Sequence, residues 1–235
     1  MQGKTQAAAR VAAMMAATAL LAAGCATPPA NTVTQLALPG AQRPAAARDW
    51  RLHCGDLSQY GDFGTARPDR LEGLVLLLDG RCWMVQSSGR VSPPPDGLCL
   101  ANATLVRFQW DQTLSIRERT SRANVEALLD RAIGERGALC AVKLSGRFLS
   151  LNTRKAFASS DSGAGPETVE YPDIGGTLVG FRFPEHLRGV CAPGYHFYFL
   201  SQNRQYGGEV VDFLLQDGVA EVDACARYLL VTGKD

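Results

Sequence analysis

The stretch from Gly175 to Phe213 reads GGTLVGFRFPEHLRGVCAPGYHFYFLSQNRQYGGEVVDF and decides the fold of this chain. It contains three strand-like runs, Thr177–Phe183, Tyr195–Leu200 and Glu209–Leu215. Because side chains of a strand alternate between its faces, His196 and Tyr198 point the same way and the two phenylalanines flanking Tyr198 point oppositely. The SQNRQYGG turn then returns an antiparallel strand that carries Glu209 alongside. The pattern therefore predicts three polar side chains converging on one face of a sheet.

These three side chains differ in how well they suit a metal ion. Imidazole and carboxylate are common zinc ligands. A tyrosine must first lose a proton whose ordinary pKa is about 10, and its phenolate suits a harder ion such as Fe³⁺ better. The only other histidines are His53 and His186, so this motif holds no three-histidine cluster. Two interpretations follow: a metal site with an altered ligand set, or side chains that hydrogen-bond across a hairpin.

Several motifs in this stretch resemble the metal-binding half of the acetolactate decarboxylases, which convert 2-acetolactate into acetoin. They are GTLVGF, PGYH and GG-x-V-x-DF, at Gly176–Phe181, Pro193–His196 and Gly207–Phe213. Other blocks resemble the family in the same order, at Tyr60–Gly64, Leu71–Gly80, Gly146–Phe148 and Thr153–Arg154. The resemblance implies a β-rich α+β fold of two packed β-rich halves with one main helix. It also implies a site between the halves and a homodimer.

The resemblance implies specific roles for some positions. The positions of His196, Tyr198 and Glu209 hold three zinc-binding histidines in the family, so zinc is the metal that the family would supply. A family glutamate falls on Leu74, which cannot shuttle a proton.

Two further family positions lie elsewhere in the chain. A second glutamate falls on Leu230. Arg154 matches the arginine that holds the substrate's carboxylate, a task for which a planar two-pronged donor is well suited. A surface salt bridge is the other interpretation of Arg154.

Two function hypotheses follow. In the first, the chain is a degenerate member that no longer decarboxylates 2-acetolactate, has no metal cofactor and binds a small carboxylate ligand. In the second, it is an active decarboxylase or related lyase that uses an altered His/Tyr/Glu site around one divalent metal. Metal analysis and an acetoin assay distinguish the two.

The N-terminus is predicted to be a targeting segment, residues 1–24. A basic start with Lys4 and Arg10 precedes an apolar run that ends in LLAAGC, which resembles the lipobox of bacterial lipoproteins and places the lipidated cysteine at Cys25. A plain secretory signal and an uncleaved anchor are the alternatives. Residues 25–48 are rich in Ala, Pro and Thr and are predicted to be a solvated tether, followed by the folded domain at 49–235.

Charge argues against a nucleic-acid partner. Without the targeting segment, 22 basic residues face 23 acidic ones, and no basic cluster with interleaved aromatic residues occurs. The expected partner is instead the membrane, through the lipid anchor. Ala26 and Thr27 after the anchor lack the Asp that retains lipoproteins at the inner membrane. In an organism with two membranes, the protein is therefore expected on the outer membrane, facing the periplasm.

Six cysteines remain after the anchor, and their even number in an exported protein favours disulfides. The candidates are Cys54, Cys82, Cys99, Cys140, Cys191 and Cys225. Six cysteines allow 15 pairings, which the sequence does not rank. Free buried thiols are the alternative.

The rest of the chain predicts short strands and one helix. Leu71–Leu78 is expected to be a buried strand that turns at Asp79-Gly80 into a hairpin partner at Cys82–Gln86. A second turn is expected at Gly146-Arg147. The helix rests on apolar residues at helical spacing, with Thr120 or Ser121 as its cap and Gly134 or Gly137 as its end. These residues are Val125, Leu128, Leu129, Ala132 and Ile133.

The anchor prediction is tested by Cys25→Ser. This variant is expected to be released from the membrane or mislocalised, because it lacks the acyl chains that hold a mature lipoprotein firmly. Its domain is expected to fold, since it begins well beyond Cys25. Cell fractionation and the melting curve of the variant are the measurements. A variant that stays membrane-bound after signal removal, or a domain that does not fold, contradicts the prediction.

Overall fold

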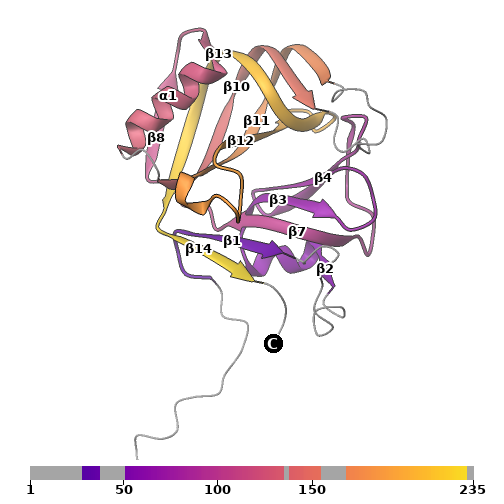
Figure 1. Ribbon diagram of the computed structural model, residues 1–235. Coiled ribbons are helices and arrows are strands. Elements are labelled where there is room, and N and C mark those ends of the chain that lie inside the picture. The colour runs from indigo at the N-terminus through magenta and orange to yellow at the C-terminus, as the bar shows by residue number, and fades with distance from the viewer. Residues whose placement is uncertain (1–27, 38–50, 135–137, 155–167, 232–235) are drawn as a thin grey trace, which may run out of the picture.

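The computed structural model describes residues 28–37, 51–134, 138–154 and 168–231. The predicted signal peptide and Cys25 lie outside these residues. Among the described residues, no helix combines the length and apolar character needed to cross a bilayer. Two sheets and one α-helix make up the folded part (Figure 1), so the β-rich α+β prediction is confirmed.

The first sheet has the strand order β14-β1-β7-β3-β4-β5-β6, with β2 paired to β7. Its strands are β1 (Thr32–Ala37), β2 (Leu52–His53), β3 (Phe63–Pro68), β4 (Leu74–Leu78), β5 (Arg81–Val85), β6 (Val91–Ser92), β7 (Cys99–Val106) and β14 (Arg227–Val231). The predicted hairpin is confirmed as β4 and β5. Asp79 and Gly80 at its turn have positive φ angles of 52° and 75°, as a two-residue hairpin turn requires.

The second sheet has the order β10-β11-β12-β13-β8, and β9 pairs with β13. Its strands are β8 (Gln112–Ile116), β9 (Thr120–Ser121), β10 (Leu139–Arg154), β11 (Thr168–Phe183), β12 (Gly194–Ser201) and β13 (Gly207–Cys225). Because β10 also pairs with β13, the strands β10 to β13 close into a ring. All connections between neighbours in this ring are antiparallel.

Strand alternation divides the interior into separate cores. On β12, Phe197 and Phe199 pack inside the second sheet with α1 (Arg122–Ile133), whereas Tyr198 packs against the core between the two sheets. On β4, Leu74, Leu76 and Leu78 join that intersheet core. The residues between them pack on the outer side of the first sheet, near the short 3-10 helix η2 (Cys54–Gln59).

The helix has the predicted boundaries. The Ser121 side chain accepts a hydrogen bond from the backbone N–H of Asn124 at 3.4 Å, which satisfies one of the unpaired donors of the first turn. Gly134 ends the helix in the left-handed conformation, with φ 73°. Val125 and Leu129 are its buried residues.

Two sequence predictions are wrong. Residues 32–37 form β1 rather than part of a solvated tether, because Val33 and Leu36 are fully buried and the strand pairs with β7 and β14. Residues 38–48 of that tether lie outside the described residues. The chain also does not turn at Gly146-Arg147 but continues through it as β10, with a register shift against β13 after Arg147. Gly146 instead permits close packing, since a Cβ there would lie 2.3 Å from the carbonyl oxygen of Asp217.

Aspartates fix the segment that links the two sheets, between β7 and β8. Asp62 accepts the backbone N–H of Phe108 at 2.9 Å, and Asp223 accepts that of Gln109 at 2.8 Å. Asp223 is fully buried, and burial raises the pKa of its carboxyl group. The sheets are therefore tied together by side chain to backbone hydrogen bonds as well as by the apolar core.

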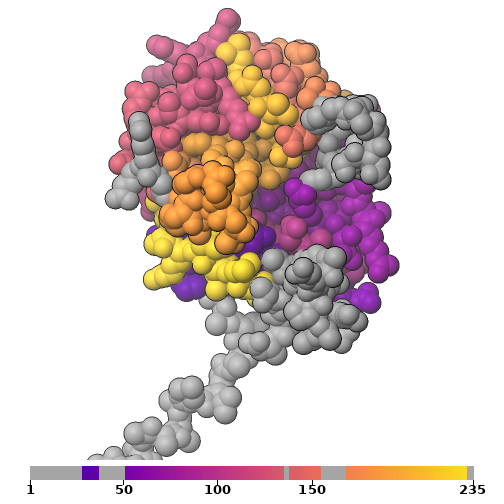
Figure 2. Space-filling model, in the orientation of Figure 1, coloured from indigo at the N-terminus to yellow at the C-terminus, as the bar shows by residue number. Residues whose placement is uncertain are grey.

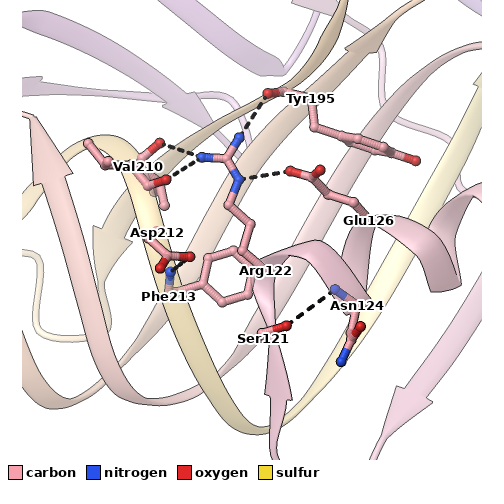
Figure 3. Close-up of polar contacts among 9 residues, drawn as sticks. Ser121, Arg122, Asn124, Glu126, Tyr195, Val210, Asp212 and Phe213 are labelled. Carbon is pink, nitrogen blue, oxygen red and sulfur yellow. Dashed lines mark hydrogen bonds and ion pairs between the residues drawn. The ribbon is translucent and has the colours of Figure 1, made fainter.

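One arginine ties α1 to the hairpin formed by β12 and β13 (Figure 3). The Arg122 guanidinium donates to the carbonyl oxygens of Val210 at 3.1 Å, Val211 at 2.6 Å and Tyr195 at 3.2 Å. Its Nε forms an ion pair with Glu126 at 2.8 Å. Tyr195 directly precedes His196, and Val210 directly follows Glu209, so Arg122 fixes the backbone beside both residues.

Replacing Arg122 tests how much it contributes to the stability of the fold. Arg122→Gln is expected to lower the free energy of unfolding by about 2–3 kcal/mol, since a hydrogen-bonded charged group is lost and backbone carbonyls lose their donors. The matched control is Arg131→Gln on the same helix, where the side chain is exposed and, among the described residues, hydrogen-bonds to the Ala127 carbonyl of its own helix. The control is expected to change by less than about 0.5 kcal/mol. Chemical denaturation measures both variants, and equal losses would contradict the assignment.

Candidate ligand-binding site

A cavity of about 580 Å³ lies between the two sheets, and several positions that the sequence analysis assigns to a site line it. His196 and Tyr198 enter it from β12. Leu74 of β4 and Leu230 of β14 line it from the first sheet. The positions that the family resemblance assigns to two metal ligands and two glutamates thus meet in one cavity, although they lie far apart in the sequence.

The loop between β11 and β12 forms one side of this cavity. It includes the short 3-10 helix η4 (Glu185–Leu187), and its residues 189–192 line the cavity. Figure 2 shows the loop as an orange lobe above the yellow C-terminal strand. His196 is tied to the loop, because its Nε2 lies 2.7 Å from the Ala192 carbonyl oxygen.

The four predicted site residues lie together on neighbouring strands. In the strand register, Glu209 of β13 is directly opposite Tyr198 of β12 and also opposite Arg154 of β10. Directly opposed side chains in antiparallel strands are close neighbours. His196 lies two residues from Tyr198 on the same face of β12. Of these four, only His196 and Tyr198 line the cavity, and Arg154 is exposed.

Tyr198 is a neutral phenol at physiological pH. Burial raises its pKa to about 12, and the nearby Glu209 carboxylate acts in the same direction. Arg67 and Arg154 oppose this shift without cancelling it. A phenol with this pKa offers a hydrogen-bonding O–H group rather than an anionic ligand.

These donors do not fit the family's zinc ion. A carbonyl oxygen can only accept, so His196 Nε2 donates its proton to Ala192 and leaves only Nδ1 with a free lone pair. Tyr198 keeps its proton, so Glu209 is the only anionic donor of the three. Within the described parts of the chain, no group of three His, Cys, Asp or Glu side chains is placed to hold a metal. We therefore derive no chemistry through a metal.

The remaining lining is cationic, neutral polar and apolar. Arg67 of β3 lies at the cavity together with Thr65 of the same strand. Thr104 donates to the Gln35 side chain at 2.6 Å, which orients the two polar groups of β7 and β1. Phe183 adds an aromatic side chain. Among the described residues, no acidic side chain lines the cavity.

Two positions that the sequence does not single out are Arg67, which lines the cavity, and Arg122, which binds distant backbone carbonyls. Arg67 follows a run of small and apolar residues and belongs to no motif. Its role depends on β3 pairing with β7, which brings it to the cavity. The sequence pattern places Arg122 in a helix that packs on the core. No local pattern indicates its hydrogen bonds to the distant backbone carbonyls.

The six candidate cysteines are all free thiols in the structure. Cys140 and Cys225 are buried, and the other four are half-buried. Disulfide formation, which depends on the redox environment, stays a prediction.

Comparison with known proteins places this geometry in a family. The family model named alpha-acetolactate decarboxylase matches residues 45–234. The alpha-acetolactate decarboxylase of Methanosarcina mazei is 32% identical over 189 residues, which cover 77% of this chain and 66% of that protein. The corresponding protein of Methylococcus capsulatus is 29% identical over 182 residues, which cover 74% of this chain and 70% of that protein.

Solved structures share the fold. The crystal structure of alpha-acetolactate decarboxylase from Bacillus subtilis strain 168 superimposes with a TM-score of 0.74 at 23% identity, covering 87% of this chain and 90% of that one. A Staphylococcus aureus protein of unknown function, described as similar to alpha-acetolactate decarboxylase, gives a TM-score of 0.74 at 24% identity, with 86% and 89% covered. The family model spans most of the chain and the fold agrees with it. This chain belongs to the alpha-acetolactate decarboxylase family.

Proposed function

We propose that this chain is a lipid-anchored envelope protein that binds a small carboxylate in the cavity between its sheets and does not decarboxylate 2-acetolactate. The observation that carries this proposal is the cavity lining. In the part of the chain that the structure describes, this lining contains Arg67 and His196 and no acidic side chain. It has Leu74 and Leu230 where the family resemblance places glutamates. The cavity is about 580 Å³, which is the size of a small-molecule site.

The lining supports an anionic ligand with a short apolar part. A guanidinium can hold a carboxylate through two parallel hydrogen bonds. Glutamates in a partly desolvated site would repel a carboxylate ligand. Leucines at these two positions remove that repulsion. Leu74 and Phe183 offer apolar contacts to the carbon skeleton, and the polar groups of Thr65 and Gln35 can bond hydroxyl or carbonyl oxygens.

The same lining argues against decarboxylation. Loss of CO₂ leaves an electron pair on carbon, which must be stabilised and then protonated. A leucine at either glutamate position supplies no proton. With His196 Nε2 bonded to Ala192 and Tyr198 neutral, the His/Tyr/Glu set is poorly suited to hold a zinc ion, which would stabilise the developing charge as a Lewis acid.

A second candidate is an active enzyme with an altered metal. The observation in its favour is the strand register, which opposes Tyr198 directly to Glu209, with His196 on the same face. An ion shared by these three side chains would need an ionised Tyr198. The raised pKa of Tyr198 is the argument against it.

Metal content and turnover distinguish the two candidates. The purified full chain, incubated with zinc, manganese or iron and then desalted, is expected to hold far less than one metal per chain. It is also expected to form no acetoin from 2-acetolactate above the spontaneous rate. The control is the double variant Tyr198→His with Glu209→His, which restores three histidines and is expected to retain zinc. Stoichiometric metal with acetoin formation by the unmodified chain would show that the altered-metal enzyme is correct.

Binding without turnover is tested by calorimetry. The probe is 2,3-dihydroxy-2-methylbutanoate, a stable reduced relative of 2-acetolactate, and acetoin is the uncharged comparison. The carboxylate is expected to bind and acetoin is not. Arg67→Gln is expected to weaken carboxylate binding about 10-fold or more, as the loss of a charged hydrogen bond implies.

The matched control for this variant is Arg70→Gln. Arg70 lies three residues further along the chain, its side chain is 92% exposed, and it forms an ion pair with the neighbouring Asp69 at 3.7 Å. This variant is expected to bind the carboxylate as the unmodified chain does. Equal binding of acetoin and the carboxylate, or equal losses in the two variants, would refute the assigned role of the cavity.

A further inference from the structure

Cys54 and Cys82 are far apart in the sequence but lie close together in the fold. Cys99 and Cys191 instead hydrogen-bond to residues of their own segments. Cys99 donates to the carbonyl of Gly97 at 3.7 Å, and Cys191 donates to that of Leu187 at 3.9 Å. Cys82 instead donates to the carbonyl oxygen of Cys54 at 3.8 Å, 28 positions away in the chain. The two thiols also interact with each other, which lowers the pKa of Cys54 and raises the pKa of Cys82.

The surrounding structure holds both thiols in place. Cys54 begins η2, directly after His53. Both the backbone and the ring of His53 are held in place: its backbone N–H donates to Asp56 at 2.8 Å, and its ring lies 3.2 Å from the Leu98 carbonyl oxygen. Cys82 lies opposite Leu77 in the β4–β5 ladder. Both sulfurs pack against the core on the outer side of the first sheet, and neither residue is fully buried.

A second close pair is excluded by strand alternation. Cys225 lies opposite Leu139 between β13 and β10, and both pack in the core between the sheets. Cys140 is the next residue after Leu139, so it faces the other core, inside the second sheet. The sulfurs of Cys140 and Cys225 therefore lie on opposite faces and cannot be joined without moving the backbone.

We propose that Cys54 and Cys82 form a structural disulfide by exchange with an oxidised dithiol donor. The Cys54 thiolate attacks one sulfur of the donor disulfide and releases the first donor thiolate. Cys82 then gives up its proton and attacks the Cys54 sulfur, which releases the second donor thiolate. Two protein thiols lose two protons and two electrons, and the donor disulfide is reduced to a dithiol.

The order of the two attacks follows from the interaction between the thiols. That interaction lowers the pKa of Cys54 and raises the pKa of Cys82, so Cys54 is the thiol that ionises first. A thiolate is the attacking species in exchange. The product would join η2 to β5 and restrict the unfolded chain between them, which stabilises the folded state.

Tryptic mapping of the full chain tests the pairing. Purified reduced protein is incubated with oxidised glutathione as the probe donor, alkylated and digested without reduction. Trypsin separates the three nearest cysteines, because Cys54 falls in residues 52–70, Cys82 in 82–90 and Cys99 in 91–107. The expected product is 52–70 linked to 82–90, with a mass two hydrogens below the sum of the two peptides.

Other products overturn the proposal. Alkylated 52–70 and 82–90, a stable glutathione adduct on either peptide, or a link from 52–70 to 91–107 each shows that this pair does not form. A stability measurement gives a second readout. Reductant is expected to lower the melting temperature of the oxidised unmodified chain and of Cys99→Ser but not that of Cys82→Ser. An equal reductant effect in all three proteins would overturn the proposed pair as well.

Discussion

The pairing of β13 with both β12 and β10 is the constraint on which the rest of the structure depends. It closes the second sheet into a ring around an aromatic core, in which Phe148 contacts both Phe199 and Phe213 edge to face. The same pairing sets Glu209 between Tyr198 and Arg154. A register slip of one residue would turn every one of these side chains to the opposite face. The core and the polar row therefore specify the same register.

Much of this arrangement is predictable because its signals are local. A period of two places Phe197 in one core and Tyr198 against the other, and a period of 3.6 gives α1 with Ser121 and Gly134 at its ends. Periodicity does not identify site residues. The family motifs do, because they align Leu74 and Leu230 with site glutamates of the family. The cavity then brings both leucines to the same place as His196.

The parts that could not be predicted depend on contacts between distant residues. Val33 lies in a segment whose composition is typical of a linker, and only pairing with β7 and β14 makes it a strand. The Gly146-Arg147 pair predicts a turn, whereas Gly146 permits the close approach of β10 and β13. Arg67 gains its role from strand pairing, and the contact between Cys54 and Cys82 spans 28 positions. Composition and spacing carry no information on such contacts.

The proposed function requires that a family scaffold bind a carboxylate without the groups that catalyse its decarboxylation. Catalysis requires groups that interact more strongly with the transition state than with the substrate, such as an acid that delivers a proton or a metal ion that stabilises negative charge as a Lewis acid. Leucine at both glutamate positions and a neutral Tyr198 remove such groups. In the proposed function, Arg67 binds a carboxylate that is already present in the ground state, and this interaction would weaken as CO₂ departs. A site built in this way stabilises the bound acid and leaves the barrier to decarboxylation in place.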